Sequence, residues 1–453
     1  MNKFFFATLL FALGLLHPSF AQKKDPIPLN DANTPLHLLQ PNYPIPYTPP
    51  TIEAVTKTLH HIHSYLDTVT PPLLINEQKG TLVEDPSQID SNTILKKGDY
   101  RLVSYEWGVV YGAMLLATEA TGDIRFKKYA FDRLQFLADA APQFKKQTIA
   151  RAETKTKTPL HNLLFPHALD DCGAMCAAMI KSLRSGSKAN MRGLIDDHID
   201  YILHREHRLT DGTLARMRPQ SNTIWLDDLF MSVPALAQMG KLTGDPKYYD
   251  EACKQVLAFS ARMFNKEKGL FMHGWVEGMT EHPQFHWARA NGWAIMTMVE
   301  LLDILPENHP KRNEILTLLK AHAKGLAACQ SNSGFWHQLL DRSDSYLETS
   351  ATAIYTFSFA RAINRGWIDP IAYSPATLLA WNAVSTKVNN QGQVEGTCVG
   401  TGMGFDPAFY EYRPISPYAA HGYGPTILAG AEIIQLLKTH TFEINDSALQ
   451  IKR

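Results

Sequence analysis

Two pairs of adjacent aspartates are the residues of this sequence best suited to chemistry. They are Asp170-Asp171 in ALDDCGAM and Asp227-Asp228 in IWLDDLFM. A single aspartate at the start of a helix usually caps it, because the carboxylate accepts backbone N–H groups and suits the helix dipole. In a pair flanked by apolar residues, one carboxyl can cap the helix while the other faces a cleft. The pairs therefore predict acid–base chemistry by carboxyl groups, with Asp227 as the candidate acid and base.

Aromatic and basic residues occur at the starts of other expected helices. Tryptophan rings bind the apolar faces of pyranose rings, so several of them at one rim predict a sugar-binding cleft. Arg289 lies in a mostly apolar stretch and needs an anionic partner, which is either an aspartate of the protein or a substrate carboxylate. Arg216 and Arg218 are further candidates for binding a substrate carboxylate. The tryptophans concerned are Trp107, Trp225, Trp287 and Trp293.

The elements that would position these residues are helices. Apolar residues recur at helical spacing in twelve segments, whereas strand-like alternation is scarce and short. Two helix pairs share a Thr-Gly-Asp link, in which Gly122 and Gly244 can take the left-handed conformation that ends a helix. The aspartate after each glycine can cap the next helix. The expected helices span residues 51–70, 107–121, 125–144, 171–184, 189–206, 227–243, 246–264, 288–305, 310–330, 349–366, 373–388 and 423–438.

The order of these helices predicts the fold. An apolar helix followed by an amphipathic one, six times over, indicates an inner and an outer ring. We therefore expect an all-α fold, a single (α/α)6 barrel of six helical hairpins, with an open helical solenoid as the alternative. In a barrel the starts of alternate helices lie at one end. The aspartates, tryptophans and arginines, together with His421 in HGYGP, would then converge on one cleft.

The first 21 residues have the features of a signal peptide. Lys3 supplies the positive start, residues 4–16 form an apolar run too short to span a bilayer comfortably, and small residues precede a cleavage site between Ala21 and Gln22. We therefore expect an exported protein, periplasmic if the host has an outer membrane, that is not inserted in a membrane after cleavage.

The rest of the chain predicts one large domain. Residues 22–50 are rich in proline and form an extended lead-in, and residues 51–453 form a single catalytic domain. With 44 basic and 44 acidic residues, the chain has no net charge that would attract nucleic acid.

Neither the cysteines nor the clustered histidines predict a metal site. Cys172 and Cys176 are four apart on an expected helix, and we interpret them as small core residues rather than a redox or metal pair. His60, His61 and His63 do not share one face of their helix, so we interpret them as surface residues. Metal-binding and nucleotide-binding motifs are missing in suitable contexts, and we expect neither a metal nor a cofactor.

With these residues in view, the chain resembles the unsaturated glycuronyl hydrolases of glycoside hydrolase families 88 and 105, and family 105 more closely. The resemblance runs from about residue 55 to 440 and rests on WLDDLFM, FMHGW, HWARANGW, YLETSATA and HGYGP. It implies an (α/α)6 barrel that needs no metal. It also implies that Asp227 is the catalytic aspartate and Asp171 a second essential one. The predicted substrate-binding residues are Trp107, Arg216, Trp225, His273, Trp287, Arg289, Trp293 and His421.

The resemblance also implies a reaction, the release of a terminal Δ4,5-unsaturated uronic acid from an oligosaccharide made by a lyase. Protonation of C4 places positive charge on C5, water adds there, and the hemiketal opens and expels the remaining sugar. One carboxyl can donate and then remove a proton, so Asp227 must begin protonated. Burial beside Trp225 and Phe230 and the charge of Asp171 would raise its pKa. Galacturonyl substrates from pectin and glucuronyl substrates from algal or arabinogalactan glycans both stay open.

Three other functions remain compatible with the sequence. An inverting glycosidase of the same fold would act on saturated glycans with Asp171 and Asp227 as its two carboxyls. An exported glycan-binding protein would use the same cleft without turnover. A helical-barrel sugar epimerase would rely on paired histidines, whereas the expected rim is richer in aspartate.

Overall fold

The computed structural model describes residues 29–35, 38–39, 43–150 and 158–452, and the chain divides into two compact units, residues 1–41 and 42–453. In the described part of the smaller unit, the side chain of Asn30 accepts a hydrogen bond from the backbone of Ala32. The predicted signal peptide and its cleavage site lie outside the described residues, as do the first seven residues of the proline-rich lead-in.

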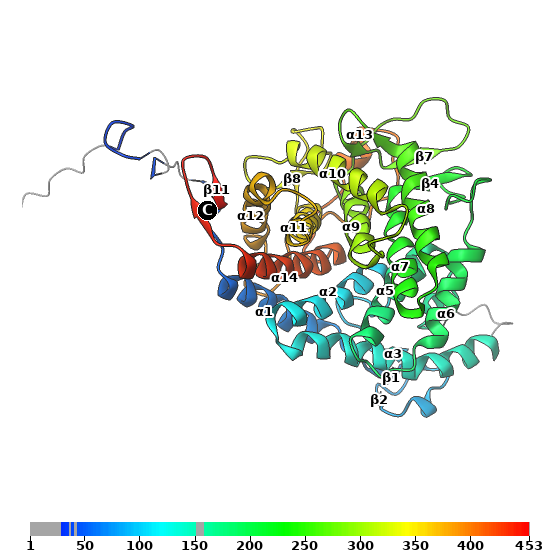
Figure 1. Cartoon of the computed structure of the whole chain (residues 1–453). Helices are drawn as coiled ribbons and strands as arrows, with labels where there is room; N and C mark the ends of the chain where they lie inside the picture. The colour runs from blue at the N-terminus through cyan, green and yellow to red at the C-terminus, as the bar shows by residue number, and fades with distance from the viewer. Residues whose placement is uncertain (1–28, 36–37, 40–42, 151–157, 453) are drawn as a thin grey trace, which may run out of the picture. The chain divides into compact units, whose positions relative to one another are not determined.

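Six helices form a closed inner ring (Figure 1). Each contacts the next along the chain, and the last contacts the first. They are buried on nearly all sides, and every residue of α9 from Ala288 to Leu302 is inaccessible to solvent or almost so. The ring consists of α2 (Tyr105–Thr121), α5 (Leu169–Arg184), α7 (Val233–Thr243), α9 (Ala288–Ile304), α11 (Thr349–Asn364) and α14 (Tyr423–Thr439).

Six further helices lie outside this ring, each against one inner helix, so the predicted (α/α)6 barrel is confirmed. Helix α1 shows the expected amphipathic pattern by burying Val55, Leu59, Ile62 and Leu66 at helical spacing, whereas α12 is apolar on most sides. The outer helices are α1 (Ile52–Val69) on α14, α3 (Ile124–Ala150) on α2, α6 (Arg192–Asp200) on α5, α8 (Pro246–Met263) on α7, α10 (Arg312–Ala328) on α9 and α12 (Pro370–Ser385) on α11.

Two links between helices follow their sequences. Gly122 and Gly244 end α2 and α7 at a φ of 76°, and Asp245 caps α8 by accepting a hydrogen bond from the backbone of Lys247. The helices expected over 189–206 and 227–243 are both shorter than predicted. Helix α6 ends at Asp200, where a π-helical turn follows. The first part of the other is the 3-10 turn η4 (Leu226–Leu229), and α7 begins only at Val233, where Pro234 suits a first helical turn.

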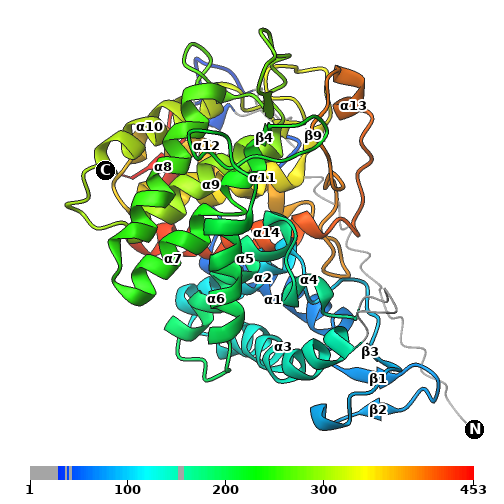
Figure 2. The ribbon, with the colours of Figure 1, turned by 90° about the vertical axis from the view of Figure 1, so that its right-hand side faces the viewer.

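Short strands and turns join the helices, and several lie at the end where the inner helices begin. Strand β4 (Thr223–Trp225) pairs with β7 (Gly274–Val276), and the Leu226 backbone N–H donates to the carbonyl of His273. A sheet of β1 (Leu74–Asn76), β2 (Leu82–Val83) and β3 (Thr93–Leu95) lies beside α3 (Figure 2). The other short elements are β5 (Phe264–Asn265), β6 (Leu270–Phe271), β8 (Trp336–His337), β9 (Leu347–Glu348), β10 (Phe442–Ile444), β11 (Leu449–Ile451), α4 (His161–Leu164), α13 (Pro407–Glu411), η2 (Pro86–Gln88), the π-helical turn η3 (Tyr201–Arg205) and η5 (Ala420–Gly422).

The described residues bear on the expectations for thiols, membrane spans and metal sites. Cys172 and Cys176 are buried free thiols in the core, as expected. Across the described ranges, each helix is too short or too polar to cross a lipid bilayer. Within the same ranges, the structure brings together no group of three or more His, Cys, Asp or Glu side chains suited to a metal ion.

Candidate active site

The buried guanidinium of Arg216 gathers two aspartates from different elements. It donates to Asp228 of η4 at 2.5–3.1 Å and to Asp170, in the first turn of α5, at 2.9 and 3.1 Å. Its carbon lies 4.4 Å from the centre of the Trp225 ring. Burial lowers the pKa of Arg216, but the two carboxylates outweigh burial and the net shift is upward. Arg216 is therefore a permanent cation whose ion pairs with Asp228 and Asp170 connect η4 to α5.

Asp227 is left out of this arginine cluster and bonds to a histidine. Its Oδ2 lies 3.0 Å from Nε2 of His273, and its side chain is 14% exposed. On the other side of the imidazole, Nδ1 lies 2.8 Å from the hydroxyl of Tyr410 in α13. The structure thus forms a chain of three groups, from a tyrosine through a histidine to a carboxylate that solvent can reach.

The direction of the pKa shift of Asp227 is opposite to the sequence expectation. Burial raises the pKa of Asp227, but the hydrogen bond and charge of His273 and the charge of Arg216 outweigh it, and the net pKa lies below the ordinary aspartate value. The expectation of a raised pKa counted only burial and the charge of Asp171. It missed the two cationic or proton-donating neighbours, which lie 46 and 11 residues away in the sequence.

The second predicted aspartate, Asp171, has different neighbours from those expected. Its Oδ1 accepts from the side chain of Asn162, and its Oδ2 accepts from the backbone of His167 and lies 2.8 Å from the ring Nδ1 of that residue. Successive residues in a helical turn point about 100° apart, so only one of the pair can reach Arg216. That residue is Asp170 rather than Asp171.

The four predicted tryptophans divide into two groups. Trp225 lies at the aspartate cluster, with the guanidinium of Arg216 over its ring, and Trp287 packs its ring 4.7 Å from that of His273. The other two pack against core residues and, like Trp287, are almost inaccessible to solvent. Trp107 faces the outer ring, where its Nε1 donates to the hydroxyl of Tyr129. Trp293 stacks on Phe230 at 4.9 Å. The predicted stacking of a sugar on Trp107, Trp287 and Trp293 is therefore corrected, because their rings are buried.

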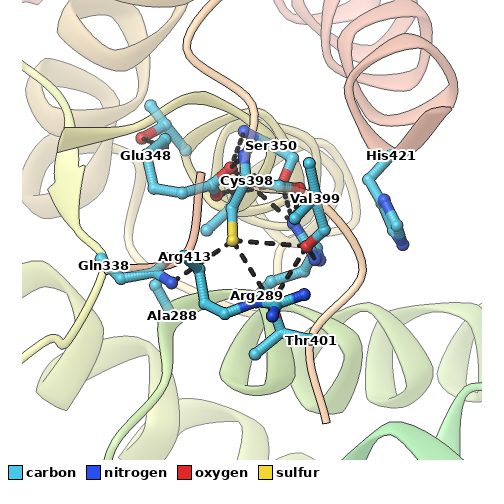
Figure 3. A network of polar contacts seen from close by, with 12 residues as sticks. Ala288, Arg289, Gln338, Glu348, Ser350, Cys398, Val399, Thr401, Arg413 and His421 are labelled. Atoms are coloured by element: carbon cyan, nitrogen blue, oxygen red, sulfur yellow. Dashed lines mark hydrogen bonds and ion pairs between the residues drawn. The ribbon is translucent and has the colours of Figure 1, made fainter. Parts of the chain in front are cut away.

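The two terminal nitrogens of Arg289 bond to groups of the protein itself, whereas its buried Nε has no hydrogen-bond partner among the described residues (Figure 3). Its guanidinium donates to the backbone carbonyls of Cys398 and Val399 at 2.6 and 2.7 Å and lies 3.9 Å from Glu348. Glu348 in turn accepts from the backbone N–H groups of Cys398, Ser350 and Ala351. Of the two interpretations left open, the structure shows a bond within the protein, although with a glutamate and carbonyls rather than an aspartate. Arg289 anchors the segment that follows Gly396.

This anchored segment, residues 396–413, contacts Trp225 and His273, which lie next to Asp227. Met403 packs against Trp225, and a side chain on Gly402 would touch the same ring. Gln338 donates to the carbonyl of Tyr410 and to the sulfur of Cys398, which fixes the segment near both of its ends. Sequence reasoning missed Tyr410, since FDPAFYEYR carries no signal beyond Asp406, which caps the short helix α13.

His421 lies at the same end of the barrel. Its Nε2 is 2.6 Å from the hydroxyl of Tyr105 and 3.4 Å from Glu106, both in the first turn of α2. Burial, and then the charge of Arg289, lower the pKa of His421 well below its usual value, so the ring stays neutral. The structure places seven of the candidate residues at one end of the barrel, namely Asp227, His273, Arg216, Trp225, Trp287, Arg289 and His421.

Comparisons with known proteins agree with this arrangement. The model of the family described as Glycosyl Hydrolase Family 88 matches residues 81–437. The chain is 32% identical, over 46% of its own length and 51% of the relative's, to an unsaturated 3S-rhamnoglycuronyl hydrolase of Alteromonas sp. (strain LOR). It is 30% identical, over 52% of its length and 65% of the relative's, to a protein of the same name from Formosa agariphila. The chain thus spans about half to two thirds of the length of these curated relatives.

Solved structures show the same fold over nearly the whole chain. A possible member of family GH105 from Klebsiella pneumoniae superposes with a TM-score of 0.66 at 25% identity, covering 91% of this chain and 99% of that one.

Proposed function

The chain belongs to glycosyl hydrolase family 88, and from that premise we propose that it releases a terminal Δ4,5-unsaturated uronic acid from oligosaccharides by hydration of the C4=C5 bond. The observation that carries this proposal is the position of Asp227. It is a carboxylate at the end of the barrel that bonds to a histidine while the neighbouring aspartates neutralise Arg216. The curated relatives are named as unsaturated rhamnoglycuronyl hydrolases, which supports the same reaction class.

In the proposed mechanism the His273–Asp227 pair supplies one proton and takes one back. A uronate carboxylate that enters the site displaces water and adds negative charge, and both effects raise the pKa of Asp227. With His273 as the imidazolium, its Nε2 proton passes to Asp227 and on to C4 of the substrate, which leaves a neutral imidazole with its proton on Nδ1. Positive charge develops at C5 and is shared by the ring oxygen. Water attacks C5 and returns its proton to Asp227, and the resulting hemiketal opens and expels the remaining sugar.

The surrounding residues have supporting roles in this proposal. Trp225 offers a ring for sugar stacking, and Trp287 holds the imidazole of His273 by ring contact. An inverting glycosidase that pairs Asp227 with Asp171 is less well supported, because Asp171 is bonded to Asn162 and to the backbone of His167.

We also propose export of the protein, for which N-terminal sequencing of secreted material is the test, with cleavage after Ala21 expected.

The experiment that tests the activity is a panel of polysaccharides digested by lyases and then treated with the protein. Loss of the ultraviolet absorbance of the C4=C5 double bond, with release of one sugar, is the expected result. The matched control is the same oligosaccharide with its terminal uronide saturated, which is expected to stay intact. Cleavage of the saturated control would contradict hydration and favour an ordinary glycosidase. The panel also tells galacturonyl from glucuronyl substrates.

A further inference from the structure

Tyr410 has an unusual position for a residue with no assigned task. It is fully buried, and it reaches His273 across 137 residues of sequence. Its hydroxyl accepts a hydrogen bond from the backbone N–H of Gly404 at 2.9 Å and can donate to the carbonyl of the same residue at 3.3 Å. Burial raises the pKa of Tyr410, so the hydroxyl stays neutral. Gly404 therefore offers this hydroxyl both a donor and an acceptor.

Because Gly404 offers both a donor and an acceptor, the Tyr410 hydroxyl can hydrogen-bond to Nδ1 of His273 whether or not that nitrogen carries a proton. When Nδ1 carries no proton, the hydroxyl donates to it, and Nε2–H donates to the carboxylate of Asp227. When the imidazole is a cation, Nδ1–H donates to the tyrosine oxygen, and the hydroxyl turns to the Gly404 carbonyl. His273 is only 1% exposed, so water does not replace this partner.

The charges that face this chain of groups come from several elements. Arg216, from the segment before β4, and His273 act on Asp227. The charge of Asp227 acts to raise the pKa of Asp228 in η4, of Tyr105 in α2 and of Arg289 in α9. The charges of Asp227 and Asp406 both act to raise the pKa of Tyr410. Asp170 of α5 acts on Asp228 and on Tyr105. Among these groups, Tyr410 is the residue that contacts the far nitrogen of the imidazole.

We propose that Tyr410 is a positioning residue of the reaction, which through His273 keeps the His273–Asp227 pair able to hold the proton that C4 receives. The inference rests on the proposed function, because only a reaction that begins with proton donation needs the pair to be protonated. Tyr410 itself gains and loses no proton overall, since its hydroxyl only turns between two acceptors. Because Tyr410 lies in segment 396–413, protonation of the His273–Asp227 pair depends on the packing of that segment against Trp225 and His273.

Removal of the hydroxyl has a predictable sign. In Tyr410→Phe, the neutral imidazole loses a donor to Nδ1, whereas the cationic imidazole is left with a buried N–H that has no acceptor. A buried charged N–H without an acceptor costs more free energy than a buried neutral nitrogen without a donor. The imidazole of His273 therefore loses its second proton more readily in the variant. The alkaline fall of kcat/KM is therefore expected to move to lower pH by about one unit, which is about a ten-fold loss at a fixed pH on that limb. At lower pH the variant should approach the wild type.

The first experiment compares pH profiles of kcat/KM for the wild type, Tyr410→Phe and the control Tyr412→Phe. Tyr412 lies in the same segment but is 85% exposed, and its variant should match the wild type. A melting temperature for each protein shows that it is folded. A loss by the same factor at every pH, or no loss, would overturn the proposal, because a purely structural role would not shift the profile.

The second experiment needs no turnover. Nitrogen-15 NMR of histidine-labelled protein, with His273→Gln to identify the resonances, reports which ring nitrogen carries the proton. The neutral ring should keep its proton on Nε2 in both proteins, because Asp227 accepts it. The doubly protonated ring, with a proton on each nitrogen, should persist to higher pH in the wild type than in Tyr410→Phe. Identical spectra at every pH would overturn the proposal. A wild type without activity on unsaturated uronides would instead contradict the proposed function, and the spectra would still show whether Tyr410 helps His273 to hold its second proton.

Discussion

Two buried arginines, one at each end of the inner ring, are each held between two carboxylates. Arg216 lies between Asp170 and Asp228 where the inner helices begin. Arg361 lies where they end and bonds to Asp303 of α9 and Glu432 of α14, both at 2.7 Å. The two guanidinium side chains are equally buried, at 8% and 9% exposure. By charge and burial alone, either cluster could be taken for a functional site.

The surroundings of the two clusters differ. At the Arg361 end a polar cavity of about 240 Å³ is lined by further matched ions, such as Lys181 and Glu300, whose charged atoms are 2.5 Å apart. At the Arg216 end a third carboxylate, Asp227, bonds to a histidine that can exchange a proton. A buried charge matched by an opposite charge is structural, whereas a carboxylate coupled to a titratable partner can do chemistry.

The largest effect should come from the one carboxylate that distinguishes the clusters. Asp227→Asn removes the proton donor and acceptor, so kcat should fall by about 10²- to 10⁴-fold, the usual contribution of a general acid–base group. Substrate consumption followed by ultraviolet absorbance measures this loss. The matched control is Asp250→Asn on the outer helix α8, whose side chain is 66% exposed and whose activity should be unchanged. Near-normal turnover in Asp227→Asn would remove the distinction.

Replacing each arginine tests whether the two clusters share a structural role. Arg216→Met and Arg361→Met each leave two buried carboxylates without a cation, and each should lower the free energy of unfolding by about 3–5 kcal/mol. Denaturant unfolding measures this. The activity per folded molecule should fall at least ten-fold in Arg216→Met, because Asp227 loses a neighbouring positive charge, and should be kept in Arg361→Met. Equal activity in both variants would contradict the comparison.

The aromatic ring over each arginine gives a smaller contrast. Trp225 covers Arg216 at 4.4 Å, and Phe357 covers Arg361 at 5.3 Å. Trp225→Leu should raise KM by about ten-fold through lost stacking on the sugar, which is within the usual range for an aromatic contact. Phe357→Leu should cost only about 1 kcal/mol of stability and leave KM unchanged. An unchanged KM in Trp225→Leu would remove this tryptophan from the proposed sugar site.

The smallest effect concerns the dependence of stability on pH. The folded pKa of Asp227 is lowered, so its ionisation stabilises the native state above the unfolded value of about 3.9, and this contribution is lost as the pH falls through the folded pKa. The stability of the wild type relative to Asp227→Asn should therefore decline below about pH 4. Unfolding midpoints of both proteins at pH 6 and pH 3 measure the change. A relative stability that rises in acid would show that Asp227 is protonated in the resting protein.

The sequence predicted the barrel well because helical periodicity is a local property. All twelve expected helices occur, and most lie within a few residues of the predicted bounds. Three differ by six residues, because α3 runs on to Ala150, α6 ends at Asp200 and α7 begins only at Val233. The order of the helices also predicted that Asp227 lies at the end of the barrel where the inner helices begin. The choice between Asp170 and Asp171, the direction of the pKa shift and the place of Trp107 did not. Each depends on where one side chain points and on partners distant in the sequence, such as Tyr410 for His273.

The closure of the ring has a consequence for synthesis of the chain. Helix α14, the last of the ring, packs against α1 and α2, so residues more than 300 apart in the sequence must meet before the barrel is complete. Contacts this distant form late and slow folding. A nascent chain that has not yet reached residue 423 exposes the apolar faces of α2 and α11, which favours aggregation or chaperone binding until the final helix arrives.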